Sequence, residues 1–120
     1  MEKLFTLRKR KEFLRVAKEG FKMVTSTIIL TAAQNFCADN ETQVGFTATK
    51  KIGKATVRNR AKRRLRALTR TNLGSFLPQT DYVLIARFNT AECEYNKLED
   101  DFKFGLKKLN KLLEENDGKK

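Results

Sequence analysis

The sequence predicts a single domain of the α+β class, with helices and strands in the order α-β-β-α-β-α. Hydrophobic residues repeat at helical spacing in three segments, and runs rich in β-branched or alternating apolar residues lie between them. The chain has 120 residues, too few for two separate cores, so we treat residues 1–120 as one domain. We expect an ordered core over about 4–114 and a flexible tail at 116–120.

The first half of the chain predicts one helix followed by two strands. Phe5 to Gly20 has apolar residues at helical spacing and ends in a glycine, which suits a helix C-terminus. Met23 to Ala33 is rich in β-branched residues and predicts a strand, and Asn35 to Thr42 is a polar loop. Gln43 to Thr49 alternates apolar and small or polar residues, which indicates a half-buried strand. We expect these two strands to form an antiparallel hairpin.

The second half predicts a basic turn, a helix, a loop, a buried strand and a final helix. Lys50 to Lys54 is the turn, Ala55 to Thr71 the helix, and Asn72 to Thr80 the loop, which holds the only proline. Asp81 to Phe88 is almost continuously apolar and predicts a buried strand. Asn96 to about Glu115 is an amphipathic helix. Its apolar stripe contains Leu98, Phe102, Leu106, Leu109 and Leu113.

The excess positive charge is concentrated in one segment. Residues 42–80 contain ten Lys or Arg and no Asp or Glu, whereas the rest of the chain has sixteen basic and fourteen acidic residues. This concentration indicates a polyanionic partner. Projected on a helix, the segment after Lys54 has an apolar face of Val57, Ala61, Leu65 and Leu68. The adjoining face carries Arg58, Asn59, Lys62, Arg63, Arg66 and Arg70, and Arg60 and Arg64 lie on the far flank of the apolar face.

A cationic helix face without acidic residues favours phosphate binding over a merely solvated face. Like charges at i, i+4, such as Arg58, Lys62 and Arg66, destabilise a helix by a few tenths of a kcal/mol per pair. Ordinary solvated helices avoid this by mixing Glu with Lys. Arginine, which outnumbers lysine here, also suits bidentate contacts to phosphate and stacking on bases. Basic residues alone do not distinguish RNA from DNA.

Several other classes of protein are disfavoured. The chain has no histidine, which removes the commonest general base and metal ligand. Cys37 and Cys93 lack metal-type spacing and are expected to be reduced thiols. No apolar run approaches the roughly 20 residues of a membrane span, and the N-terminus lacks the apolar segment of a secretory signal. We therefore expect no membrane association and a cytoplasmic location.

The basic segment resembles the signature of the bacterial ribonuclease P protein subunit. The matching residues are Lys50-Lys51-Ile52-Gly53-Lys54-Ala55 and Val57-Arg58-Asn59-Arg60-Ala61-Lys62-Arg63. The similarity continues through Glu12-Phe13, Val44-Gly45-Phe46 and Asp81-Tyr82, and covers roughly residues 4–112. It implies a two-layer α/β sandwich similar to a domain of ribosomal protein S5, with a left-handed βαβ crossover through the basic helix, an exception to the usual right-handed rule.

The resemblance also implies a function. The catalyst would be an RNA subunit that removes the 5′ leader of precursor tRNA, with Mg²⁺ at the RNA active site and no catalytic residue, metal or cofactor in the protein. No obligate protein partner is evident. The residues implied to bind the catalytic RNA are Lys50, Lys51, Lys54, Arg58, Asn59, Arg60, Lys62, Arg63, Arg66 and Arg70. A cleft beside the first helix would bind the leader, and its candidate residues are Phe13, Ala17, Leu30, Thr47 and Thr49.

Parts of this interpretation have alternatives. Phe13 could be a plain core residue, and Ala17 stands where family members often have a bulky residue, so the apolar part of the cleft could move to Leu14 or Leu30. The chain could instead be a ribosomal or general RNA-binding protein without a processing role. An autonomous nuclease would need metal ligands, but in the only tight acidic cluster, Glu99 to Asp101, adjacent helical residues point in different directions. A helix-turn-helix would require a helix at Gln43 to Thr49, where the alternation is strand-like.

Overall fold

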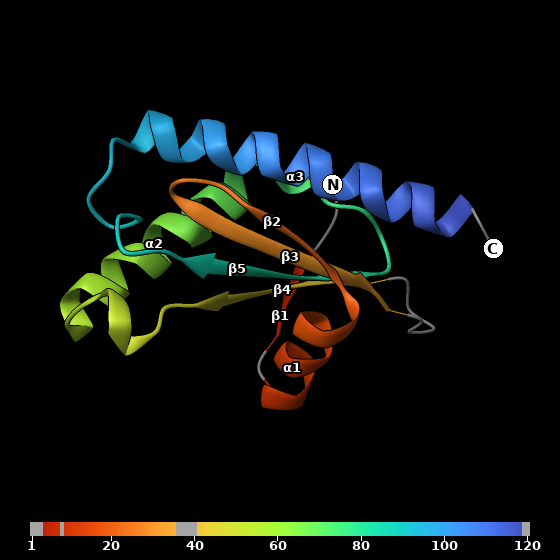
Figure 1. Cartoon of the computed structure of the whole chain (residues 1–120), viewed down its shortest axis with the longest axis horizontal. Coiled ribbons are helices and arrows are strands. Elements are labelled where there is room, and N and C mark those ends of the chain that lie inside the picture. The colour runs from red at the N-terminus through yellow and green to blue at the C-terminus, as the bar shows by residue number, and fades with distance from the viewer. Residues whose placement is uncertain (1–3, 8, 36–40, 119–120) are drawn as a thin grey trace.

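The computed structural model describes residues 4–7, 9–35 and 41–118 (Figure 1). In these residues the elements are β1 (Leu4–Thr6), α1 (Arg10–Glu19), β2 (Phe21–Val24), β3 (Ile28–Gln34), β4 (Thr42–Thr47), α2 (Ala55–Thr71), β5 (Thr80–Ala86) and α3 (Tyr95–Gly118). Short 3-10 turns, η1 (Lys50–Ile52) and η2 (Leu73–Ser75), flank α2. The predicted α+β class is confirmed. The predicted order is kept, with one strand added before the first helix and the next strand divided in two.

The strands form one five-stranded sheet in the order β1-β4-β5-β3-β2. β4 is parallel to both β1 and β5, whereas β3 is antiparallel to both β5 and β2. Figure 1 shows α3 running along one side of the sheet, with α2 on that same side and α1 on the other. The parallel neighbours β4 and β5 are joined through α2, which is the βαβ crossover that the resemblance implies.

Strand β5 lies in the middle of the sheet because both of its faces are apolar. Tyr82 and Leu84 belong to the main core under α2 and α3, and Val83 belongs to a second, smaller cluster with Leu7 and Val16 under α1. This two-sided burial explains the almost continuous apolar run of this strand. The predicted apolar faces of the helices are confirmed: Ala61, Leu65, Leu68, Leu98, Phe102, Leu106, Leu109 and Leu113 are all buried in the main core.

The N-terminal part of the chain differs from the prediction. Leu4–Thr6 is a strand parallel to β4, and the first helix begins only at Arg10. The predicted end of this helix is correct, since the N–H of Gly20 donates to the carbonyl oxygen of Val16 at 2.9 Å. A Cβ at Gly20 would lie 2.3 Å from the carbonyl oxygen of Ala32, so only glycine lets α1 pass this close to β3.

The predicted strand from Met23 to Ala33 is divided by a turn. The N–H and the hydroxyl of Thr25 both donate to the carbonyl oxygen of Ile28, at 2.9 and 2.7 Å, which closes the turn between β2 and β3. Threonine side chains make such local bonds in competition with a continuous strand. β-Branched composition therefore predicted the strand conformation but not the reversal within it.

The predicted hairpin between this strand and Gln43 to Thr49 is wrong. β3 pairs with β2 and β5, and β4 pairs with β1 and β5, so β5 lies between the two strands expected to be neighbours. Leu84 of β5 is in register with Leu30 on one side and Phe46 on the other. The final helix also continues to Gly118, beyond the predicted end near Glu115.

Candidate nucleic-acid interface

The basic helix α2 is anchored by its apolar face. It begins at Ala55, as predicted, after Lys54, whose side chain makes no capping hydrogen bond. Ala61, Leu65 and Leu68 are completely buried against the sheet, and Val57 packs partly buried beside them. Because this face is fixed in the core, the remaining side chains of α2 are held in a constant pattern on the surface.

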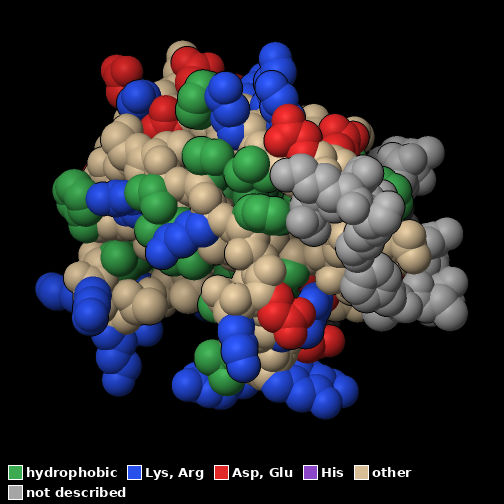
Figure 2. All heavy atoms as spheres, turned by 45° about the vertical axis from the view of Figure 1, so that its right-hand side comes forward, with side chains coloured by type: hydrophobic (Ala, Val, Ile, Leu, Met, Phe, Trp, Pro, Cys, Tyr) green, Lys and Arg blue, Asp and Glu red, His purple; other side chains and the backbone are tan. Residues whose placement is uncertain are grey.

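The predicted cationic residues share one exposed surface formed by η1, the turn after it and α2. Lys50, Lys51, Lys54, Asn59, Arg60, Arg63, Arg66 and Arg70 are exposed, and Arg58 and Lys62 are half-buried. Figure 2 shows Lys and Arg side chains without acidic neighbours at the lower left of the molecule, the end where α2 begins in Figure 1. In the described part of the chain, only Arg60 of this set has an ion pair, with Glu92 at 3.2 Å. The positive potential of this surface is therefore almost uncompensated.

Two arginines of α2 also have contacts within the fold. The Arg64 guanidinium donates to the carbonyl oxygens of Thr90 and Cys93, at 3.0 and 2.6 Å, and thereby fixes the turn before α3. The guanidinium of Arg66 lies over the ring of Phe46, 5.5 Å from its centroid. The Nε of Arg58 is buried and has no hydrogen-bond partner within the described residues. Arg64 is thus structural, whereas most of its neighbours point to solvent.

The second predicted surface lies on the sheet face that carries α1. Phe13 is half-buried over Gly45, where an added Cβ would lie 2.6 Å from its ring, so the structure brings Phe13 and β4 together. Thr47 lies on the same face of β4 as Gly45 and is half-buried, and Thr49 is exposed just after the strand. Ala17 is exposed on α1.

The prediction that Leu30 lines this surface is wrong. Leu30 is completely buried in the main core, and its side chain is the first group that a Cβ on Gly105 of α3 would meet. It therefore faces α3, on the opposite side of the sheet from α1. Its neighbour Ile29, in register with Ile85, is half-buried on the α1 side, because successive strand residues face opposite sides.

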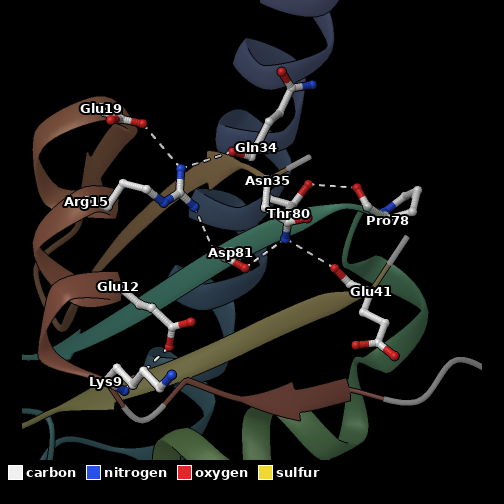
Figure 3. A network of polar contacts seen from close by, with 10 residues as sticks. All are labelled: Lys9, Glu12, Arg15, Glu19, Gln34, Asn35, Glu41, Pro78, Thr80 and Asp81. Carbon is white, nitrogen blue, oxygen red and sulfur yellow. Dashed lines mark hydrogen bonds and ion pairs between the residues drawn. The ribbon is translucent and has the colours of Figure 1, made fainter. Parts of the chain in front are cut away.

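A buried carboxylate that sequence reasoning missed holds α1 against the sheet. Asp81 accepts a 2.6 Å hydrogen bond from Arg15 of α1 and a 2.8 Å bond from the amide of Asn35 (Figure 3). Arg15 also donates to the carbonyl oxygen of Gln34, and Asn35 donates to that of Glu41. The sequence offered one signal for this contact: Asp81 is a charged residue at the start of the apolar run of β5. A buried carboxylate requires a partner.

The acidic cluster on α3 is used inside the fold. Asp101 accepts hydrogen bonds from the hydroxyls of Ser26 and Thr27 and pairs with Lys97, while Glu99 faces Lys103. Burial alone would raise the pKa of Asp101, but these hydrogen bonds outweigh it and hold the pKa below its usual value. The residues that the structure describes contain no group of three potential metal ligands, and none of their helices is long and apolar enough to cross a membrane. Cys93 is free, and Cys37 lies outside the described residues.

A sheet that fixes a helix with a nearly uncompensated cationic face is the arrangement expected of a polyanion-binding protein. The family model of ribonuclease P matches residues 1–110. The "ribonuclease P protein component" of Natranaerobius thermophilus is 37% identical over 116 residues, covering 97% of this chain and 98% of that protein. The protein of that name from Streptococcus pneumoniae is 31% identical over 118 residues, covering 98% and 94%. The chain therefore belongs to the ribonuclease P protein family.

Solved structures support the same fold. The RNase P protein of Thermotoga maritima has a TM-score of 0.74 and 27% identity, covering 86% of this chain and 96% of that one. The RNase P protein of Staphylococcus aureus has a TM-score of 0.75 at 23% identity, covering 88% and 94%. The resemblance that began from the basic motif is thus confirmed over nearly the whole chain.

Proposed function

We propose that this protein is the protein subunit of a ribonucleoprotein endonuclease that removes the 5′ leader of precursor tRNA, and that it binds the catalytic RNA through α2 and η1. Membership of the ribonuclease P protein family is consistent with a role in tRNA processing. The observation that carries the assignment of the surface is the concentration of cations on α2 and the turn before it: residues 42–80 contain ten basic residues and no acidic one. A rigid set of cations offers phosphates a binding surface without ordering long side chains on a mobile loop.

Different residues of this surface have different roles in the proposal. Arg63 and Arg70 are exposed and would grip phosphate oxygens in bidentate geometry. Asn59, exposed and uncharged among the cations, can both donate and accept hydrogen bonds, so it would make a contact that depends on the local RNA structure. The Nε of the half-buried Arg58 is buried without a hydrogen-bond partner among the described residues, so a phosphate that accepted from this N–H would satisfy an unpaired donor.

We also propose that the sheet face beside α1 binds the single-stranded leader. Phe13 and Thr47 lie on this face, and the half-buried Ile29 and Ile85 add aliphatic surface next to them. Leu14 on α1 and Val24 at the end of β2 are more than half exposed, which is unusual for large apolar side chains. Apolar and aromatic contact holds bases of any sequence, so this face suits leaders that differ between tRNAs. These aliphatic side chains supply apolar contact that Ala17 is too small to give.

Chemistry in this proposal belongs to the RNA. Its Mg²⁺ ions would activate water and stabilise the leaving oxygen, as metal ions do in phosphoryl transfer. The protein would neutralise phosphate repulsion where leader and catalytic RNA meet, and we propose that it acts in the cytoplasm.

Reconstitution tests the proposal directly. The protein is added to the catalytic RNA of a relative such as Natranaerobius thermophilus, and 5′ cleavage of precursor tRNA is measured at near-physiological Mg²⁺. We expect the native protein and Lys97→Ala, a control variant that removes one positive charge from α3, to stimulate cleavage well above RNA alone. The double variant Arg63→Ala/Arg66→Ala should lose most of that stimulation. RNA binding without stimulation would instead favour a general RNA-binding protein, and cleavage by the protein alone would favour a nuclease.

A further inference from the structure

A large hollow lies away from both surfaces described above. It has a volume of about 1140 Å³ and lies between α3 and the segment that follows α2. One wall is formed by Asn72, Ser75 and Leu77. The opposite wall, on α3, includes Lys103, Phe104, Lys107, Lys108 and Lys111. All five of these α3 residues are exposed, so the hollow opens to solvent as a groove. It is larger than the roughly 300–1,000 Å³ of a small-ligand pocket, which favours a polymer segment.

The walls of the groove are fixed to each other by hydrogen bonds. The amide of Asn110 on α3 donates to the carbonyl oxygen of Ser75 in η2 at 2.7 Å. The hydroxyl of Tyr82 in β5 donates to the Asn110 side-chain oxygen at 2.6 Å, and it accepts the N–H of Leu77 at 2.9 Å. Asn110 and the core residue Tyr82 therefore hold the two walls of the groove together.

The groove is strongly cationic. Four lysines line it, against one carboxylate, that of Glu114. In the described structure only Lys103 among these lysines has an ion pair, with Glu99 at 4.0 Å. Lys103, Lys107 and Lys111 follow one another at i, i+4, about 6 Å apart along the helix axis. Such a row repels itself in the free protein, and phosphates along an extended strand would remove that repulsion.

An aromatic ring is exposed among these lysines. The side chain of Phe104 is 58% exposed, although it lies in the middle of α3. The ammonium of Lys108 lies 5.6 Å from the centroid of this ring. A ring and cations in one groove match single-stranded nucleic acid, in which bases stack on aromatic rings while the backbone meets positive charge.

We propose that the groove between α3 and η2 is a second RNA-binding site, which holds a single-stranded segment with one base on Phe104 and its phosphates on Lys107 and Lys111. Asn72, the residue after α2, lines the groove and therefore connects it to the C-terminal end of the cationic helix, at Arg70. RNA bound on α2 could continue into the groove without leaving the protein surface. The proposal takes RNA as the partner from the proposed function, but it depends on different residues.

The test uses protein in which RNA binding by α2 is weakened by Arg63→Ala/Arg66→Ala. The result for the groove then does not depend on whether α2 binds RNA. A fluorescent octamer of 5-iodouridine is titrated against this protein, then cross-linked by light, and the linked peptides are identified by mass spectrometry. We expect cross-links in the peptide that contains Phe104. Adding Phe104→Ala should weaken binding of the octamer about tenfold. Adding Lys107→Ala should lower the salt slope, which is the steepness with which the logarithm of RNA affinity falls with the logarithm of salt concentration, by about 0.7.

Two further variants make the result decisive. Lys97→Ala removes the same charge from α3 outside the groove and should leave affinity and cross-links nearly unchanged, whereas Glu114→Gln removes the opposing carboxylate and should strengthen binding. Cross-links only in other segments, with affinity indifferent to Phe104→Ala, would overturn the proposal. A second result would also overturn it: a protein dimer that is dissociated by Phe104→Ala but is unaffected by RNA. The groove would then bind a second copy of this chain.

Discussion

The guanidinium of Arg15 in α1 donates to the carboxylate of Asp81 in β5 over 2.6 Å, across 66 positions of sequence. The Asp81 side chain is 7% exposed and the Arg15 side chain 31% exposed, so the pair is shielded on its acidic side. The pair holds α1, which carries Phe13, against the sheet. It therefore also fixes the proposed leader surface.

Replacing Asp81 by asparagine should destabilise the fold, because Arg15 then loses its charged partner in a partly buried position. We expect the free energy of unfolding to fall by about 2–3 kcal/mol. Urea denaturation of Asp81→Asn against Asp100→Asn, an exposed carboxylate on α3, measures the difference. The unfolding free energy of the control, Asp100→Asn, should change by less than about 0.5 kcal/mol. Equal midpoints for the two variants would show that the Arg15–Asp81 pair does not hold α1.

Adjacent arginines of α2 should behave oppositely. Arg63 is exposed, whereas Arg64 donates to the carbonyl oxygens of Thr90 and Cys93. Arg63→Ala should leave stability within about 0.5 kcal/mol and reduce the salt slope of RNA affinity by about 1. Arg64→Ala should lower the unfolding free energy by about 1–3 kcal/mol and change the slope less. Identical effects of the two substitutions on both measurements would contradict this division of roles.

Two glycines make a matched pair for packing. A Cβ at Gly20 would lie 2.3 Å from the carbonyl oxygen of Ala32, while a Cβ at Gly74 would meet nothing within 4 Å. Gly20→Ala should therefore displace α1 from β3 and destabilise the protein by about 1–3 kcal/mol. Gly74→Ala should be neutral or slightly stabilising. Thermal unfolding of both variants provides the comparison, and a neutral Gly20→Ala would show that α1 can shift freely.

The buried hydroxyl of Tyr82 predicts a loss of stability in alkali. Burial raises its pKa above the usual range, against the opposing effect of the hydrogen bond from Leu77. The folded state therefore keeps this proton at a pH where the unfolded chain releases it. The stabilisation is complete below the unfolded pKa of about 10 and is lost progressively as the pH rises above it.

Comparison with Tyr82→Phe isolates this effect from the titration of lysines. The variant should be less stable at neutral pH, because Asn110 and the Leu77 N–H lose their shared partner. Its deficit should narrow between about pH 10 and 12, the range in which the native protein loses the contribution of the tyrosine. A deficit that is constant over this range would mean that the hydroxyl titrates normally in the fold.

Sequence reasoning succeeded where one element's own pattern was sufficient. The limits of α2 at Ala55 and Thr71, its apolar face through Leu65, and the apolar stripe of α3 follow from helical periodicity, a property of consecutive residues. The acid-free segment indicated the cationic surface for the same reason, since ten positive charges on a helix and its preceding turn cannot all point inward.

The errors concern the partners of each element. Leu30 and Ile29 are both aliphatic strand residues, and the strand pattern does not say which of them faces α1. That choice depends on the register of β3 with β5, which joins residues some fifty positions apart. The turn at Thr25 likewise depends on side-chain hydrogen bonds that strand propensity does not include.

The sequence by itself determined the cationic helix, its packing face and, through the motif around Asn59, the family. Only the tertiary structure decided that Arg64 is a structural residue and Arg63 an exposed cation, that Asp81 fixes α1, and that Phe104 shares a groove with η2. Charge and periodicity are properties of a segment and can be read from it. The contact that a side chain makes depends on which distant backbone lies opposite, and this is set by the packing of the whole sheet.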